Sequence, residues 1–247
     1  MYSFFNRFSL ELLVFVLSFI ILLCEWHKEY FTRLGLYWKN VQFTFCLQLF
    51  FLFTALTVSS LFVDVVFLQS IQQIHHPFFE AIVAFGGWLG RGCNLMVLIT
   101  SCYFLTVLLR KNNWSQLVFG NLLSVVFTVT LCFIFKHMFL RARPYTHYSV
   151  HSFFNLEGLV HNKNAFQSFP SGDVAVVAGV AGFLFYAVKN PYARWTIFVL
   201  PFTTALSRMS LNRHWPSDTI FSIGLGFMTA SFIWQYQRCL RNEGRKR

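Results

Sequence analysis

Charged residues are scarce in this sequence. Asp, Glu, Lys and Arg make up 12% of the 247 residues, whereas hydrophobic residues make up 56%. A soluble domain has about 25% charged residues, so this chain lacks the charges needed to cover a water-facing surface. The composition excludes an ordinary soluble protein and predicts an all-α, polytopic membrane protein built as a single helical bundle.

Carboxylates are the rarer of the two charge types, with nine acidic residues against twenty Lys and Arg. They are Glu11, Glu25, Glu29, Asp64, Glu80, Glu157, Asp173, Asp218 and Glu243. A site for Ca²⁺ or Mg²⁺ needs several oxygen ligands close together. Only Asp173 and Asp218 lie in segments that also carry basic and small polar residues, so we expect no metal and no other cofactor.

Cysteine pairing motifs are missing as well. The six cysteines include no CxxC pair, and most lie within apolar runs. We interpret them as small buried hydrophobic residues rather than as a disulfide framework or a metal-ligand set.

Positive charge is abundant, with a formal net charge of +11, but its distribution argues against nucleic acid as a partner. Lys and Arg lie between apolar runs and in the C-terminal tail, as the charges that orient membrane proteins do. The expected partners are the lipid bilayer and a lipid substrate. The sequence does not indicate an oligomeric state.

Six apolar runs predict a core of six membrane spans within residues 43–238. The runs cover residues 43–63, 82–109, 115–138, 173–188, 195–209 and 217–238. An earlier run, residues 10–24, has no signal-peptide cleavage site after it and is short for a span of about 20 residues. It predicts an uncleaved helix in an N-terminal region of residues 1–42. Residues 239–247 form a basic tail.

The basic connections fall on one side of the predicted spans. They are residues 25–40, 110–111 and 189–194 and the tail, and the positive-inside rule places them in the cytoplasm. The low charge, the many Phe residues and the short loops are typical of a bacterial inner-membrane protein. The opposite face would then lie toward the periplasm.

Three polar segments interrupt the apolar sequence on that opposite side. The first polar segment is residues 136–144, the second is residues 170–173 and the third is residues 207–218. Each lies at the end of an apolar run, so we expect them to meet at one end of the bundle. Together they offer three cations, a helix N-terminus with small residues, and a His with a nearby carboxylate. This combination predicts a phosphate site that contains a nucleophile.

The polar segments supply the groups that a phosphate needs. Lys136 and Arg143 are seven residues apart and can share a helix face, and Arg208 adds a third cation. A cation at membrane depth is costly and usually functional, although one near a helix end can reach the interface by snorkelling. Ser171 and Gly172 precede a helix whose free N–H groups bind phosphate oxygens, although Pro-Ser-Gly is also ordinary turn chemistry.

His214 and Asp218 are four residues apart. A carboxylate can keep one ring nitrogen of His protonated and leave the other as a nucleophile. Such a pair is more often structural when it stands alone. The nearby Arg208 and the other two polar segments favour the catalytic interpretation here.

These segments resemble the type 2 phosphatidic acid phosphatase family, whose signature is K-x6-RP, PSGH and SR-x5-H-x3-D. The first and third motifs match at every fixed position: Lys136, Arg143, Pro144, Ser207, Arg208, His214 and Asp218. The second motif departs from the family, because Asp173 stands where the family has His. The resemblance covers about residues 43–238, including the six-span layout.

The resemblance implies metal-independent hydrolysis of a lipid phosphate or pyrophosphate. It implies a phosphohistidine on His214 that is oriented by Asp218. It assigns phosphate binding to Lys136, Arg143, Ser171, Gly172 and Arg208. The residue at position 173 would protonate the leaving group. Candidate substrates in the outer leaflet are undecaprenyl pyrophosphate, lipid A and phosphatidyl-type phosphates.

Asp173 bears on which of these substrates is used. Carboxylic acids ionise at about pH 3.9, and a helix N-terminus beside three cations favours the carboxylate further, while bound phosphate opposes it. We expect a poor proton donor, and a phosphate leaving group, with a second pKa of about 6, needs no donor. This reasoning favours a pyrophosphate-linked lipid. Two alternatives would restore cleavage of a phosphate monoester. The proton could come from His147, His151 or His161, or Asp173 could itself be protonated because of the nearby phosphate charge.

Two further interpretations stay open. One is a phosphotransferase that moves the phosphoryl group to another lipid, such as lipid A. The other is a non-catalytic lipid-phosphate binder, or lipid carrier, that kept the fold and lost the acid at position 173.

Overall fold

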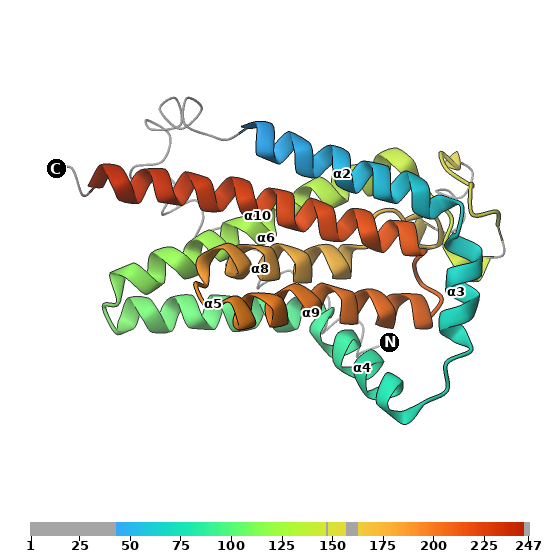
Figure 1. Ribbon diagram of the computed structural model, residues 1–247, viewed down its shortest axis with the longest axis horizontal. Coiled ribbons are helices and arrows are strands. Elements are labelled where there is room, and N and C mark those ends of the chain that lie inside the picture. The colour runs from blue at the N-terminus through green and yellow to red at the C-terminus, as the bar shows by residue number, and fades with distance from the viewer. Residues whose placement is uncertain (1–42, 147, 157–162, 245–247) are drawn as a thin grey trace.

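The computed structural model describes residues 43–146, 148–156 and 163–244 (Figure 1). The helix predicted at residues 10–24 lies outside the described residues, and so do His147, His161 and the last three residues of the tail. All regular secondary structure in the described part of the chain is helical. This confirms the all-α prediction.

Eight α-helices and two short 3₁₀ helices make up the described residues. They are α2 (Phe43–Leu61), α3 (Asp64–Gln72), α4 (Pro77–Leu89), α5 (Gly92–Leu108), α6 (Asn112–Phe139), η1 (Pro144–Thr146), η2 (Lys163–Phe166), α8 (Gly172–Ala187), α9 (Pro191–Ser210) and α10 (Pro216–Gly244). Helices α6, α8 and α9 lie close to the predicted apolar runs. Helix α10 continues past residue 238, so the first residues of the predicted tail are helical.

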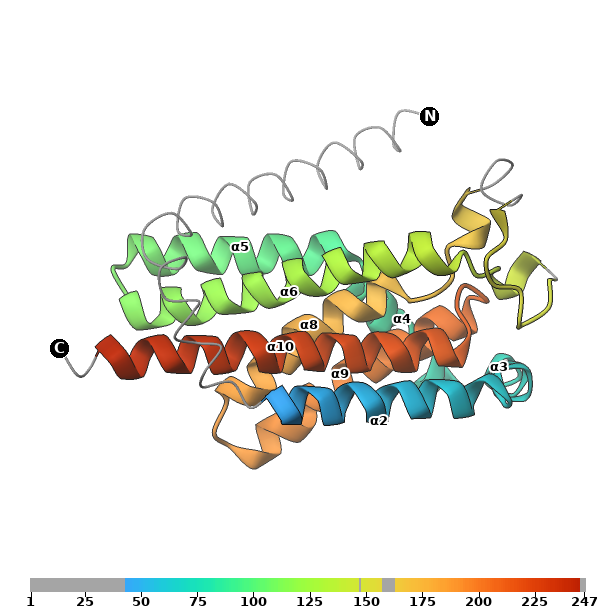
Figure 2. The same cartoon turned by 90° about the horizontal axis from the view of Figure 1, so that it is seen from above.

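Helix α10 runs through the middle of the bundle and packs against α8, α2 and α6 (Figures 1 and 2). Helix α8 is enclosed by α6, α9 and α10, and every residue from Val174 to Phe183 is buried. A helix that is apolar on all faces is stable only when it is surrounded. The approach of α8 to α10 requires glycine at position 226, because a Cβ there would overlap Ala178.

Two of the predicted spans are bent in the structure. The run at residues 43–63 forms α2, and the chain then turns by 75° into α3. The run at residues 82–109 is divided after Gly90 between α4 and α5, which meet at 56°. Helix α4 packs closely on α9, since a Cβ on Gly86 would overlap the backbone of Thr203. That contact keeps α4 beside α9 and out of line with α5.

The described helices differ in how well they suit a membrane. One stretch among them, Asn113–Thr146, is long and apolar enough to cross a bilayer, and counting each bent pair as one span raises the number to three. Helix α8 is apolar but has 16 residues, fewer than the about 20 of a full span. Helix α10 carries buried Ser and Thr side chains that lower its hydropathy. Composition and fold together indicate membrane association, and the six-span layout stays a prediction.

The three polar segments meet at one end of the bundle. Helices α6 and α9 end there, and α8 and α10 begin there, next to α3 (Figure 1). The α5–α6 turn, the α8–α9 turn and the C-terminal end of α10 lie toward the other end. The fold therefore separates the polar segments from the predicted cytoplasmic turns along the length of the bundle.

Candidate active site

The first polar segment begins in the last turn of α6. The Lys136 Nζ donates a hydrogen bond to the Gln167 carbonyl oxygen at 2.7 Å. Leu140 ends the helix in the left-handed conformation, with φ 43° and ψ 47°, which few non-glycine residues adopt. Beyond this cap, the Ser168 N–H donates to the Arg141 carbonyl oxygen at 3.0 Å. These bonds fix the end of α6 against the chain that leads into α8.

Arg141 is the largest fully buried side chain in the described part of the protein. Its guanidinium forms ion pairs with Asp64, at 2.8 Å from Oδ2, and with Asp218, and both carboxylates are also fully buried. It donates further to the Ser217 hydroxyl at 2.7 Å and to the Val150 carbonyl oxygen at 3.0 Å. Burying a charge is costly unless it is paired and hydrogen-bonded, and Arg141 meets both conditions. The result is a buried junction between α3, the loop after α6, and α10.

Asp218 lies in the first turn of α10 and has both oxygens occupied. Besides Arg141, it accepts a hydrogen bond from the Trp215 N–H at 2.9 Å and one from the Ser168 hydroxyl. The bond from Trp215 satisfies a backbone donor that a helix start otherwise leaves unpaired. The negative charge is also favourable near the helix N-terminus. The carboxylate is therefore held in one position.

The imidazole of His214 lies buried in the turn before α10. Its Nδ1 is 2.8 Å from the Ser168 carbonyl oxygen and 3.7 Å from Asp218 Oδ2, which is beyond hydrogen-bond distance. A carbonyl oxygen only accepts, so Nδ1 carries the proton and Nε2 holds the lone pair. Asp218 therefore positions the histidine indirectly. It accepts a hydrogen bond from the Ser168 hydroxyl, and the Ser168 carbonyl oxygen accepts one from His214 Nδ1.

Burial lowers the pKa of His214 from 6.5 to about 4; Asp218 opposes this effect, and Lys136 and Arg143 reinforce it. The imidazole is therefore neutral near neutral pH, which is the form that acts as a nucleophile. In the unfolded chain a histidine binds its proton at about pH 6.5. Between these two values the unfolded state binds more protons, so lowering the pH through this interval destabilises the folded state.

Among the described residues, four buried side-chain donors in the polar segments have no hydrogen-bond partner. They are the Ser171 hydroxyl at the N-cap of α8, the Arg143 Nε, the Ser207 hydroxyl and the Arg208 Nε. Gly172 begins α8 beside Lys136, since a Cβ on it would lie 3.6 Å from the Lys136 Cε. Leaving buried donors unpaired is costly, whereas an anion at the start of α8 would satisfy those of Ser171 and Arg143 together with the free N–H groups of the helix.

Asp173 and Arg208 form an ion pair between α8 and α9. The Arg208 Nε lies 3.0 Å from Asp173 Oδ2, although without hydrogen-bond geometry. The Arg208 Nη2 donates to the Gly87 carbonyl oxygen at 3.4 Å. The Asp173 side chain is 40% exposed, and exposed ion pairs contribute about 0–1 kcal/mol. An anion can therefore compete with Asp173 for Arg208 at little cost.

The structure brings all the predicted site residues to this end of the bundle. They are Lys136, Arg143, Ser171, Gly172, Asp173, Arg208, His214 and Asp218. Of the three histidines considered as proton donors, His151 is exposed on the loop after α6, and the other two lie outside the described residues.

Sequence reasoning missed Asp64, Arg141 and Ser168. Asp64 had a usable signal, because a lone carboxylate between apolar runs is costly and is functional by default in a membrane protein. Arg141 lies inside the first polar segment but outside the recognised motif. Ser168 holds His214 through its backbone carbonyl, which no side-chain pattern reveals.

The chain is similar to known proteins in sequence and in fold. A sequence profile of the PAP2 superfamily matches residues 117–241. The crystal structure of Aquifex aeolicus LpxE is similar, with a TM-score of 0.50 and 20% sequence identity over 68% of this chain and 92% of that chain. At this identity the likeness concerns the fold alone. No protein with a curated description matches the chain.

Replacing Arg141 with Met should destabilise the folded protein by about 3–5 kcal/mol, because Asp64 and Asp218 would remain as buried carboxylates without a counter-charge. Thermal unfolding of the purified protein in detergent measures this effect. Arg110→Met is the matched control, since Arg110 is exposed in the α5–α6 turn. An Arg141→Met protein that unfolds at the wild-type temperature would contradict this account of the buried ion pairs.

Proposed function

We propose that this chain, which belongs to the PAP2 superfamily, hydrolyses a membrane-lipid phosphate or pyrophosphate. The reaction would proceed through a phosphohistidine at His214, without a metal ion. The family supports a lipid phosphatase in general. One observation carries the finer proposal. The Nδ1 of His214 is held by the Ser168 carbonyl, which leaves Nε2 free as the nucleophile near two buried donors that lack partners, on Ser171 and Arg143.

In the first step the Nε2 lone pair forms a bond to phosphorus as the bond from phosphorus to the leaving oxygen breaks. The leaving oxygen departs with the bonding electron pair. The phosphorylated imidazole keeps its proton on Nδ1 and is positively charged, and the Ser168 carbonyl and the nearby Asp218 carboxylate stabilise that charge. Lys136, Arg143 and the N-terminus of α8 bind the negative oxygens of the transferring group.

In the second step a water oxygen attacks phosphorus and the phosphorus–Nε2 bond breaks. The electron pair returns to Nε2, one proton of the water is transferred to solvent and the other stays on the new phosphate oxygen, and inorganic phosphate is released. The positive charges needed at the site come from Lys and Arg side chains. The carboxylates of Asp173 and Asp218 are paired with two different arginines, Arg208 and Arg141, rather than with each other around a common ligand.

The pairing of Asp173 with Arg208 supports a substrate that needs no proton donor. Asp173 forms its ion pair as a carboxylate, and a carboxylate has no proton to give to a leaving alkoxide. A leaving phosphate, with a second pKa of about 6, departs without one. The substrate class favoured by this argument is a lipid pyrophosphate, such as undecaprenyl pyrophosphate.

Arg213 gives a second reason to favour a pyrophosphate. It directly precedes His214, and its guanidinium lies 6.0 Å from the centre of the Tyr145 ring. It lies within electrostatic range of Arg143, and within the described residues neither of these two arginines forms an ion pair with a carboxylate. Two neighbouring cations that are not held in ion pairs suit a ligand with two phosphate groups.

Transfer to a second lipid is the alternative that the same site allows. The phosphohistidine would react with a phosphate or hydroxyl oxygen of a lipid such as lipid A in place of water. A non-catalytic binder is the third possibility, and it would retain the cations but show no turnover. The free Nε2 of His214 favours the two catalytic readings over binding alone.

The placement of basic residues supports a site that faces the periplasm of a bacterial inner membrane. Residues 110–111 and 189–194 lie in the turns at the end of the bundle away from the polar segments (Figure 1). The positive-inside rule assigns those turns to the cytoplasm. The candidate site would then act on lipids of the outer leaflet.

The purified protein should release inorganic phosphate from a panel of lipid phosphates and pyrophosphates, and excess EDTA should leave the rate unchanged. His214→Ala should reduce the rate to background, because it removes the nucleophile. A wild-type protein without activity on the whole panel would contradict the hydrolase, as would a His214→Ala protein that retains activity. Release only when a second lipid is supplied would favour the transferase.

Wild type should hydrolyse a lipid pyrophosphate faster than the monophosphate of the same lipid. Asp173→His should raise the monophosphate rate by about tenfold or more, since a positioned acid contributes about 10²–10⁴-fold, and should leave the pyrophosphate rate nearly unchanged. Arg213→Gln should lower kcat/KM for the pyrophosphate selectively, with Arg110→Gln as its control. A wild type that prefers the monophosphate would contradict the leaving-group argument.

A further inference from the structure

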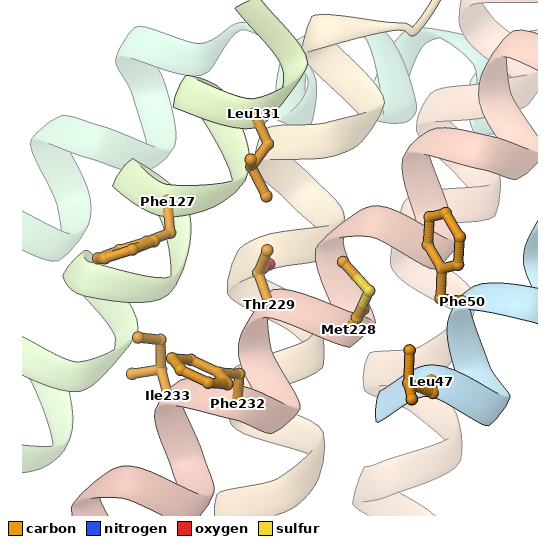
Figure 3. Close-up of a pocket in the computed structure, with 8 residues that line it drawn as sticks. All are labelled: Leu47, Phe50, Phe127, Leu131, Met228, Thr229, Phe232 and Ile233. Carbon is orange, nitrogen blue, oxygen red and sulfur yellow. The ribbon is translucent and has the colours of Figure 1, made fainter. Parts of the chain in front are cut away.

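An apolar groove lies between α2 and α6, with α10 as its floor (Figure 3). It has a volume of about 370 Å³, within the range of about 300–1,000 Å³ typical of small-molecule sites. The lining residues are Leu47 and Phe50 from α2, Phe127 and Leu131 from α6, and Met228, Thr229, Phe232 and Ile233 from α10. Helix α2 packs mainly on α10, which leaves the side between α2 and α6 open.

The groove offers nothing to a polar ligand. Among the described residues that line it, Thr229 is the only one with a polar side chain, and the Thr229 hydroxyl is already engaged with the Thr128 hydroxyl and the Leu225 carbonyl oxygen. The remaining seven side chains are hydrocarbon, aromatic or thioether groups. A hydrophobic ligand without hydrogen-bonding groups is therefore the occupant that fits the lining.

A cluster of Phe side chains connects the groove with the candidate site. Phe221 lies between Asp218 and the groove on α10 and lines a small cavity that shares Phe50 and Met228 with the groove. Its ring is 4.7 Å from that of Phe169, the residue before Pro170 in the second polar segment. Apolar side-chain contacts thus lead from Phe169, in the backbone next to the proposed phosphate-binding residues, through Phe221 to the groove.

The position of the groove along the bundle matches the depth of a lipid chain. At 1.5 Å per residue, Met228 and Ile233 are about 15 and 22 Å along α10 from Asp218. On α6, Leu131 is about 8 Å from Lys136 by the same rise. One leaflet of a bilayer contributes about 15 Å of hydrocarbon. Leu131 and Met228 lie within that depth and Ile233 lies beyond it. A lipid whose phosphate is bound at the site would therefore have its chain beside the Leu131 and Met228 end of the groove, and a longer chain would extend toward Ile233.

We infer that the groove binds one hydrocarbon chain of the lipid whose phosphate group occupies the candidate active site. This inference rests on the proposed function. It adds a second determinant of substrate choice, because the polar end of the bundle selects the phosphate groups and the groove selects a long single chain. An isoprenoid chain attached to a pyrophosphate satisfies both requirements with one molecule.

The first test locates the chain directly and does not depend on turnover. A lipid pyrophosphate with a diazirine near the end of its chain is photolysed with the His214→Ala protein, and the labelled peptides are identified by mass spectrometry. Labelling should concentrate on Leu131, Met228 and Phe232, and the same chain carried by an alcohol should label these positions much less. Equal labelling by the two probes would overturn the inference, and so would labelling spread over α5 or confined to residues 1–42.

The second test measures, on one preparation of each variant, the ratio of kcat/KM for a long-chain and a short-chain substrate. A loss of folded protein lowers both values equally and does not change the ratio. Leu131→Trp fills the groove from α6, and Leu98→Trp is the control because Leu98 is an exposed apolar residue of α5. Leu131→Trp should lower the ratio of kcat/KM for undecaprenyl pyrophosphate to that for farnesyl pyrophosphate by about tenfold, which corresponds to losing the burial of about two methylene groups. An unchanged ratio, or an equal fall in the Leu98→Trp protein, would overturn the inference while leaving the phosphatase proposal intact.

Discussion

The guanidinium of Arg141 has no exposed surface, and it needs two carboxylates from helices that are distant in sequence. Asp64 begins α3 and Asp218 lies in the first turn of α10, so the ion pairs fix both helix starts to the loop that follows α6. The rings of Phe153 and Trp215 cover the guanidinium at 4.8 and 5.5 Å and exclude water from the pairs. Removing one of the three charged side chains leaves a buried charge without a partner, so the ion pairs are stabilising only when all three are present.

The position of the candidate nucleophile follows from this junction. Asp218 is held by Arg141, and its second oxygen holds the Ser168 hydroxyl. The Ser168 carbonyl in turn holds Nδ1 of His214. The histidine is therefore oriented by a chain of contacts that begins at a buried arginine. Ser171 and Gly172, the residues proposed to bind phosphate at the start of α8, follow Ser168 within four positions of the chain, so the candidate nucleophile and the proposed anion site are positioned by the same backbone segment.

The helical bundle and the position of its polar end could be predicted from sequence, because long apolar runs that end in polar segments are visible in the sequence itself. The runs corresponding to α6, α8 and α9 gave helix ends close to those observed, and the spacing of Lys136, Arg143, His214 and Asp218 indicated one site. The bends were not predictable in this way. The division at Gly90 depends on how closely α4 approaches α9, and the partnership of Asp64 with Arg141 depends on a contact across 77 positions. The role of Ser168 is carried by its backbone, which has no side-chain signature.

The proposed mechanism requires that His214 Nε2 becomes covalently bound to the phosphoryl group during turnover. Rapid quenching of the wild-type protein with a lipid pyrophosphate radiolabelled in its terminal phosphate tests it most directly. We expect a labelled protein that is stable to alkali and labile to acid, with the label on the peptide that contains His214. The label should form no more slowly than product and should be absent from His214→Gln. A wild type that turns over without a labelled intermediate, or a His214→Gln protein that still acquires the label, would contradict it.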